Sequence, residues 1–176
     1  MILTAGGFKI LRDNFGRLTQ SQVDGFNFLV SEIDKDKSIS YTQAAYILAT
    51  TWHETAHTML PVKERGSDAY LRSKRYFPYI GYGYVQLTWK DNYQRVGKLI
   101  GVDLIKNPEL ALQADIAAKI LIQGMKHGWF TGKKLADYIH QSKKDYVGAR
   151  RIINGTDKAQ KIANEALIIE KALRSL

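Results

Sequence analysis

The sequence contains no cysteine, which excludes disulfide bonds and thiolate chemistry and suits a reducing compartment. It also lacks any run of about 18 consecutive apolar residues, so we expect no transmembrane helix. The N-terminal segment, MILTAGG, has neither the basic region nor the long apolar stretch of a secretory signal peptide. Internal repeats and low-complexity segments are absent as well. We therefore expect a soluble chain without an export signal.

The composition is that of an ordinary globular protein, with 45% hydrophobic and 24% charged residues. A length of 176 residues predicts a single domain, and nothing in the sequence indicates more than a monomer. The 26 basic residues exceed the 17 acidic ones, giving a net charge of +9 that points to a polyanionic partner. Anionic lipid and acidic cell-wall polymer fit that charge. Nucleic acid is not expected, because no nucleic-acid-binding motif is present.

Helix signals recur along the chain, and they predict a mainly α fold. Apolar residues at helical spacing predict a helix over residues 19–35, and Ser40 with Gln43 forms a capping box that opens a helix ending near Glu54. Thr88 with Asp91 and Ser142 with Asp145 form further capping pairs. With proline and glycine signals, including Gly101 as a stop, they predict helices over residues 88–100, 107–127, 142–154 and 157–175. Residues 55–87 break this pattern, and we expect an irregular insertion there with a small hairpin around residues 79–85. A shorter break covers residues 128–141.

Two carboxyl groups near this insertion are candidates for acid–base catalysis. Glu54 ends a strongly apolar helix, where burial and the negative end of the helix dipole favour the protonated form of a general acid. Glu64 lies between Lys63 and Arg65, whose positive charges favour the ionised form that a base requires. Such a pair is what glycosidic hydrolysis uses. The same residues would also fit a frayed helix end and a solvated charge run.

A second motif overlaps the first, because residues 53–57 read His-Glu-Thr-Ala-His. This H-E-x-x-H pattern places two histidines one helical turn apart in zinc peptidases and amidases, with the glutamate as base. A third ligand is not evident: neither His127 nor His140 belongs to an extension of the motif. We therefore expect no metal and no other cofactor, with a zinc-dependent peptidase or amidase as an alternative.

Several longer motifs follow one another in a fixed order over about residues 42–175. They are His53-Glu54-Thr55, the stretch YIGYGYVQLTW at 79–89, Asn92-Tyr93, IGVDL at 100–104, NPEL at 107–110 and IING at 152–155. In this order the sequence resembles the family 19 glycoside hydrolases, the plant-type chitinases of the lysozyme-like superfamily, and it closely resembles their phage endolysin relatives. The resemblance implies a bilobal helical domain over residues 1–176, with the irregular lobe at about 55–87 and no separate wall-binding domain.

The resemblance also implies roles for individual residues. Glu54 matches the proton donor, Glu64 the base that activates water, and Thr88 a hydroxyl that holds this water. Such an enzyme inverts the sugar configuration and keeps its carboxyl groups ~6.5–9.5 Å apart. The residues that match substrate-binding positions are Gln86, Asn92, Tyr84, Tyr93 and Asn154. Hydrogen bonding at a helix start would equally explain the amides, and core packing the tyrosines. The insertion also offers rings for stacking on sugars, at Tyr70, Tyr76, Phe77, Tyr79, Tyr82 and Tyr84.

Departures from the plant enzymes favour a substrate other than chitin. The segment between Glu54 and Glu64 is shorter, and Gly81-Tyr82-Gly83-Tyr84 replaces a Gly-Arg-Gly-Pro motif. With the charge of +9, these changes favour anionic peptidoglycan. The prediction is a phage lysozyme that cleaves the β-1,4 bond between N-acetylmuramic acid and N-acetylglucosamine and lyses the host. Chitinase activity on the same scaffold is an alternative, as is a non-catalytic basic binding module.

The expected location follows from the resemblance and the missing export signal. A phage enzyme of this type accumulates in the host cytoplasm until a holin opens the membrane and releases it to the cell wall. The predicted last helix, 157–175, carries Lys158, Lys161, Lys171 and Arg174 around an apolar stripe. It is either a core helix with a solvated face or an amphipathic element that makes transient contact with an anionic outer membrane.

Overall fold

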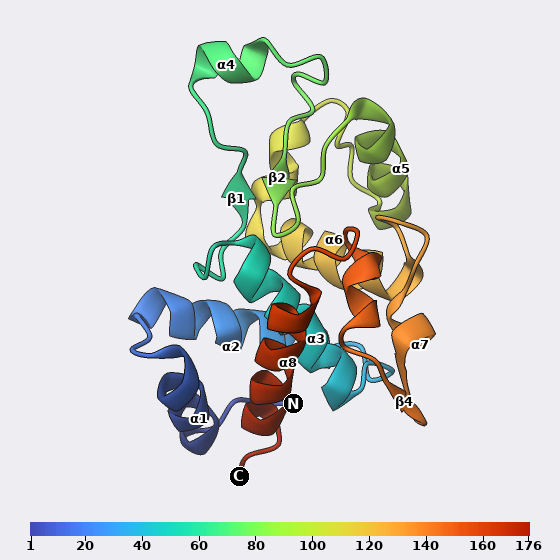
Figure 1. The fold of residues 1–176 in the computed structure, drawn as a ribbon. Helices are drawn as coiled ribbons and strands as arrows, with labels where there is room; N and C mark the ends of the chain where they lie inside the picture. The colour runs from blue at the N-terminus through green and yellow to red at the C-terminus, as the bar shows by residue number, and fades with distance from the viewer. The chain divides into compact units, whose positions relative to one another are not determined.

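The computed structural model describes residues 1–176 and is mainly helical, which confirms the predicted fold class (Figure 1). The α-helices are α1 (Ala5–Phe15), α2 (Gln20–Asp34), α3 (Tyr41–Glu54), α4 (Asp68–Arg72), α5 (Lys90–Ile100), α6 (Ala114–His127), α7 (Leu135–Tyr138) and α8 (Ala159–Leu173). Two 3-10 helices, η1 (Pro108–Leu112) and η2 (Gly148–Ile152), and four short strands, β1 (Val62–Lys63), β2 (Tyr82–Gly83), β3 (Ile139–His140) and β4 (Lys143–Lys144), complete the fold.

The chain divides into two compact units. The first comprises Met1–Met59 and Ile122–Leu176, and the second comprises Leu60–Leu121. The boundary between them therefore falls just after α3 and again within α6. Most of the predicted irregular insertion belongs to the second unit.

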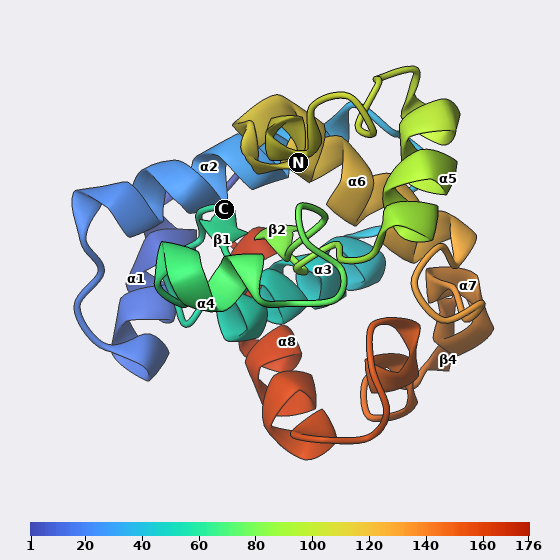
Figure 2. The same ribbon diagram turned by 90° about the horizontal axis from the view of Figure 1, so that it is seen from above.

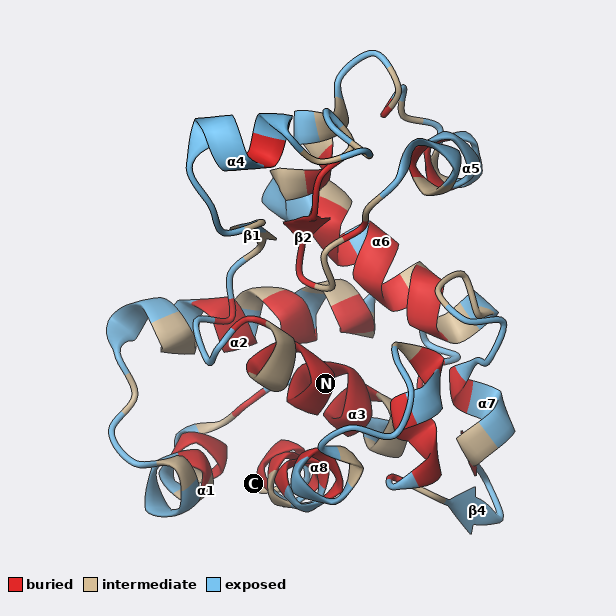
Figure 3. Cartoon of the chain, turned by 45° about the horizontal axis from the view of Figure 1, so that its top comes forward, coloured by how far each residue is buried: buried red, intermediate tan, exposed pale blue.

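Burial of α3 defines the core of the first unit. The residues from Ala44 to Trp52 are all buried, which Figure 3 shows as a red helix. The helix packs against α2 and along α8, which lies beside it in Figures 1 and 2, and α8 packs in turn on α1. The α1–α8 contact depends on Gly7, because a Cβ there would lie 2.6 Å from the carbonyl oxygen of Ala172.

The helices α2 and α3 of this core were predicted from the sequence, and each begins directly after its capping residue. In α3, the Ser40 hydroxyl accepts from the Gln43 backbone N–H at 3.2 Å, and the Gln43 side chain accepts from the Ser40 N–H at 3.3 Å. Thr19 and Gln22 form the same reciprocal pair at the start of α2. Each pair satisfies two backbone donors that a helix start otherwise leaves unbonded.

The helix predictions were incomplete or wrong at three places in the chain. The helix expected over 107–127 is two elements, η1 and α6, because the chain extends at Gln113 (ψ 130°). No α-helix spans 142–154: Ser142 lies in the turn of the β3–β4 hairpin, and only the short η2 follows it. Asp145 does act as a cap, since its carboxylate accepts from the Gly148 N–H at 2.8 Å. The first helix, α1, had not been predicted.

The second unit is built around a short antiparallel pair. Val62 pairs with Gly83, and Lys63 with Tyr82, so the strand partner of β2 is β1. The hairpin expected around 79–85 is thus partly right: β2 lies there, but it pairs across the segment that contains α4. The helix α5 is also present, although Trp89 precedes it and the predicted Thr88 cap is wrong, because the Thr88 hydroxyl donates to the Gln86 carbonyl instead. Gly101 ends α5 in the left-handed conformation (φ 73°).

The C-terminal helix α8 is a core helix. Its apolar residues, including Ile162, Ala166 and Ile169, are buried against α3 and α1. This packing uses the apolar stripe that membrane contact would need, so the membrane interpretation of this helix was wrong. No helix of the fold combines the length and apolar character that crossing a bilayer requires.

An ion pair joins the turn before α3 to the last turn of α6. Lys126 donates to the Asp36 carboxylate at 2.6 Å, and this bond, with one from Ser38, lowers the pKa of Asp36 from 3.8 to about 2. A depressed pKa in the folded state stabilises the protein above the ordinary value of 3.8, and the stabilisation disappears as the pH falls through about 2. We expect Asp36→Asn to lower the free energy of unfolding by about 1 kcal/mol near neutral pH, because the pair is partly exposed.

Urea unfolding of both proteins from neutral pH downward measures this difference. The gap between wild type and Asp36→Asn should close near pH 2, whereas a gap that persists there would contradict an electrostatic origin. Asp13→Asn is the control, since the Lys9–Asp13 pair on α1 is largely exposed and its removal should have little effect at any pH.

Candidate active site

Glu54 is held at the end of a rigid element. It is the last residue of α3, and the buried residues before it leave this helix little freedom to rotate or fray. Beyond it the chain turns away, because Ala56 and His57 both adopt positive φ values (49° and 72°). Its side chain keeps 23% of its surface exposed. The predicted acid therefore stands where a buried helix reaches solvent.

Arg150 of η2 is the partner of this carboxylate. Its Nη1 donates to Glu54 Oε1 at 2.7 Å, and its Nε donates to the Asp157 carbonyl at 2.8 Å. The guanidinium is buried, with only 4% of the side chain exposed, so the ion pair forms in a partly desolvated setting where it fixes the carboxyl orientation. Arg150 bonds to Oε1 of Glu54, and Oε2 takes no part in this ion pair.

The two histidines of the H-E-x-x-H motif do not form a zinc site. The motif needs both on one helical face, but α3 ends at Glu54 and His57 lies beyond it. The His57 ring stacks on Trp52, with centroids 4.3 Å apart and an interplanar angle of 8°. Burial, supported by the charge of Lys161, lowers the pKa of both histidines, so both are neutral at neutral pH. No three His, Cys, Asp or Glu side chains of the chain are grouped to hold a metal ion.

Glu64 is positioned by the backbone pairing of the second unit. It directly follows β1, and its N–H donates to the Gly81 carbonyl at 2.7 Å. The Gly81 N–H returns a bond to the carboxylate, at 2.9 Å from Oε2. The hydroxyl of Tyr76 donates to Oε1 at 2.5 Å. Both oxygens thus accept a hydrogen bond, and the two bonds together fix the orientation of the carboxylate.

Tyr76 links Glu64 to an exposed aromatic surface. The hydrogen bond to Glu64 raises the pKa of Tyr76 to about 12, so its hydroxyl remains a donor throughout the neutral range. Its ring lies 5.2 Å from that of Trp89, which is 52% exposed. Tyr70 and Phe77, at 50% and 43% exposure, are the other open rings of the second unit. Open aromatic faces of this kind are suited to stacking on sugar rings.

The polar residues predicted for substrate binding act largely on the local structure. The Gln86 amide donates to the carbonyls of Val62 and Gly83, which ties β1 to β2. The Asn92 amide donates to the Thr88 carbonyl at 2.9 Å, which is the helix-start bond that the sequence left open as an alternative. The Thr88 hydroxyl uses its proton on Gln86 and keeps its lone pairs to accept from a ligand or water.

The tyrosines assigned to substrate binding are core residues. Tyr93 is fully buried, and its hydroxyl donates to the carbonyls of Ile80 and Leu87, so the prediction of a sugar contact there was wrong. Tyr84, at 1% exposure, is buried as well, and so is Tyr82 at 6%. These rings have no free face for stacking, which corrects the prediction made for them. Asn154 is exposed in the turn after η2, in the first unit, where its side chain accepts from the Gly155 N–H.

Sequence reasoning missed two residues that contact the predicted catalytic pair. Arg150 is 96 positions from Glu54, and no local spacing relates them. Tyr76 is 12 positions from Glu64 and was noted only as one ring among several. The available signal was indirect: Arg150 lies two residues before the IING motif that carries part of the family resemblance.

Comparison with known proteins shows which family this chain is similar to. Residues 61–144 match the family model described as class I chitinase. An acidic endochitinase of Dioscorea japonica is 29% identical over 144 residues, which cover 77% of this chain and 53% of that protein. An endochitinase of Phaseolus vulgaris is 40% identical over 55 residues, which cover 28% of this chain and 17% of that one. The chain thus spans at most about half the length of these curated relatives.

Solved structures share the fold along almost the whole chain. Chitinase C from Streptomyces griseus superimposes with a TM-score of 0.66 at 21% identity, covering 97% of this chain and 92% of its own. A class IV family 19 chitinase from Zea mays gives a TM-score of 0.58 at 18% identity, covering 99% and 94%. Fold, family model and relatives thus agree in their direction: residues 61–144 match the family 19 glycoside hydrolases, and the whole chain is similar to them in fold.

Proposed function

We propose that this protein hydrolyses β-1,4 glycosidic bonds in polysaccharides that contain N-acetylglucosamine, with Glu54 as general acid and Glu64 as general base. The observation that carries this proposal is the contrast between the two carboxyl groups. Glu54 has one oxygen bonded to a guanidinium, whereas both oxygens of Glu64 accept hydrogen bonds. Paired carboxyl groups in different environments are what an inverting glycosidase requires.

The acid step uses the free oxygen of Glu54. Because Arg150 contacts Oε1, the proton for the leaving glycosidic oxygen resides on Oε2. When the bond breaks, this proton moves to the leaving oxygen and Glu54 becomes a carboxylate. The Arg150 guanidinium then stabilises the new negative charge, so the ion pair is strongest after proton transfer.

The base step uses the ionised Glu64. A carboxylate has about four lone-pair sites, and Tyr76 and Gly81 occupy two of them, so one oxygen still accepts the proton of an attacking water. The water adds to the anomeric carbon from the face opposite the leaving group. An inverting enzyme keeps its carboxyl groups ~6.5–9.5 Å apart to leave room for that water, and the proposal requires this separation of Glu54 and Glu64. A crystal structure with a bound oligosaccharide will measure it.

Chitin is the substrate that the relatives favour, because those compared above are named as chitinases or endochitinases. Peptidoglycan is the second candidate, and the net charge of +9 favours it, since its stem peptides and associated polymers are anionic. An enzyme of the second kind would act as a lysozyme on the wall of a bacterial host, as the resemblance to phage endolysins implies.

The assignment of the two carboxyl groups predicts the effect of removing each one. Glu54→Gln and Glu64→Gln should each lower kcat by about 10²–10⁴-fold, because each removes a proton-transfer group while retaining the shape of the side chain. Reducing-sugar release from soluble chitin oligosaccharides measures this loss. The control is Glu109→Gln, the same change at an exposed carboxylate of η1. Full activity in either catalytic variant would disprove the mechanism.

The Tyr76 hydrogen bond predicts a loss of activity when its donor is removed. Because this bond fixes Oε1 of Glu64, Tyr76→Phe should lower kcat/KM by about tenfold. Tyr70→Phe removes the same hydroxyl from an exposed ring of α4 and should leave kcat/KM unchanged. A Tyr76→Phe variant as active as the wild type would show that this bond does not act on the base.

Product analysis separates the two substrates. Chitin oligosaccharides and purified peptidoglycan are each digested, and the fragments are identified by mass spectrometry after borohydride reduction. New reducing ends at N-acetylglucosamine from chitin support chitinase action, and new reducing N-acetylmuramic acid from peptidoglycan supports lysozyme action. Release of free amines without new sugar ends would contradict both and indicate a peptidase or amidase.

A further inference from the structure

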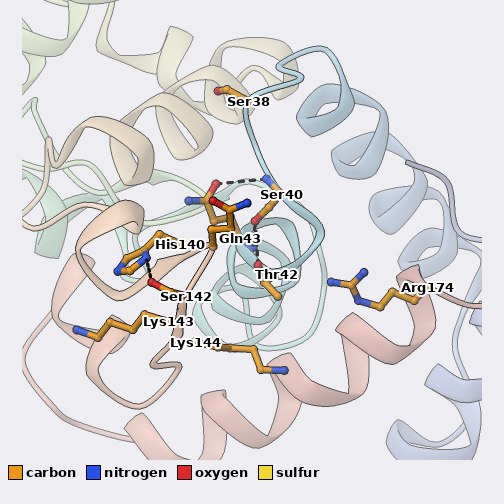
Figure 4. Close-up of a pocket in the computed structure, with 10 residues that line it drawn as sticks. Ser38, Ser40, Thr42, Gln43, His140, Ser142, Lys143, Lys144 and Arg174 are labelled. Carbon is orange, nitrogen blue, oxygen red and sulfur yellow. Dashed lines mark hydrogen bonds between the residues drawn. The ribbon is translucent and has the colours of Figure 1, made fainter.

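The first unit contains a polar cavity that the proposed reaction does not use. It has a volume of about 680 Å³ and lies where the start of α3, the β3–β4 hairpin and the end of α8 come together (Figure 4). Every side chain that lines it is a hydroxyl, an amide, an imidazole or a cation, and no acidic or apolar residue is among them. A cavity of this size accommodates a small polar ligand.

Three cations stand at this cavity, two from the hairpin and one from α8: Lys143, Lys144 and Arg174. Lys144 and Arg174 both donate to the carboxylate of Glu170, at 3.1 and 3.2 Å. Lys143 is exposed, and its ammonium group contacts only the carbonyl of Asp137 and the ring of Tyr138. Glu170 offsets one positive charge, so three cations against one carboxylate leave an excess of two.

A buried carboxylate, that of Glu170, holds two of the three cations in place. Glu170 is buried, and although burial alone would raise its pKa, hydrogen bonds from Tyr146 and Lys144 outweigh that effect and lower it. The Tyr146 hydroxyl donates to Glu170 at 2.8 Å and to the Thr42 carbonyl at 3.1 Å, which links this anchor to α3. Glu170 thus remains ionised and fixes Lys144 and Arg174 while it stays outside the cavity lining.

Neutral donors complete the lining. The hydroxyls of Ser40 and Thr42 lie 2.8 Å apart at the start of α3, and Ser142 contacts the His140 ring at 3.3 Å (Figure 4). The start of a 14-residue helix adds partial positive charge to the cations on the other two elements. Hydroxyl and amide groups suit the hydroxyls of a sugar, and the excess positive charge suits an oxyanion.

We propose that this cavity binds a saccharide that bears an oxyanion, a carboxylate or a phosphate group. The inference goes beyond the proposed hydrolysis, because it concerns binding without bond cleavage and uses none of the residues assigned to the reaction. Such a site would hold an anionic glycan on the first unit during hydrolysis elsewhere on the same polymer. Neutral chitin carries no oxyanion, so this site would not strengthen its binding.

Titration with monosaccharides tests the cavity directly. The probes are N-acetylmuramic acid for a carboxylate, N-acetylglucosamine 6-phosphate for a phosphate and N-acetylglucosamine as the neutral sugar. Backbone amide NMR should show shifts at residues 140–144 and at the start of α3 with one or both anionic sugars. The anion that binds more tightly identifies the group recognised. Added salt should weaken the binding, since partly exposed charges are screened.

A matched pair of double variants checks the role of the lysines. Lys143→Gln with Lys144→Gln should weaken binding of the anionic sugar by about tenfold or more, because it removes two of the three cations. Lys133→Gln with Lys134→Gln makes the same charge change at adjacent exposed lysines of the first unit that do not line the cavity. The single variant Lys143→Gln, an exposed side chain, provides the same test with a smaller loss if the double variant is unstable.

Three results would overturn the inference. They are the absence of binding by both anionic sugars at millimolar concentration, equal binding of the neutral sugar, and an equal loss of binding in both double variants. Because monosaccharides contain no bond for the enzyme to cleave, none of these results depends on the proposed hydrolysis. Conversely, Glu54→Gln should bind the anionic sugar as the wild type does.

Discussion

Nine consecutive residues of α3, from Ala44 to Trp52, are buried, so this helix has no solvent-exposed face toward which it could rotate. A helix confined in this way fixes the positions of the residues at its two ends. One end carries Glu54 and the other carries the hydroxyls of the polar cavity. In a close-packed interior, moving either end means moving the core, and this is why a chain without disulfides can hold functional groups in place.

The second unit achieves the same result through backbone pairing instead of burial. Glu64 follows a strand of two residues, and such a short strand would not hold a side chain by itself. Gly81 exchanges hydrogen bonds with both the backbone and the carboxylate of Glu64, and Tyr76 adds a third bond. The Gln86 amide in turn joins the two strands. The position of Glu64, the proposed base, thus depends on a polar network of the local chain.

The features that the sequence predicted correctly were mostly those that depend on residues close together in the chain. The capping box of Ser40 and Gln43 located α3 because all its atoms lie within one turn, and Gly101 likewise marked the end of α5. The pattern at Ser142 and Asp145 was misleading, since a cap residue serves a 3-10 turn as well as an α-helix. Arg150 and its ion pair with Glu54 were out of reach, because only the folded chain brings such distant positions together.

The Arg150–Glu54 pair also shows why neither residue can be understood alone. A buried guanidinium without a counter-charge is strongly unfavourable, so Arg150 needs a carboxylate beside it for the fold to be stable. A general acid, in contrast, must hold a proton before it acts. The two demands oppose each other, because a protonated Glu54 leaves the guanidinium without its counter-charge. In the proposed mechanism, proton transfer restores the full ion pair, so an interaction that stabilises the fold would also favour the product of the acid step.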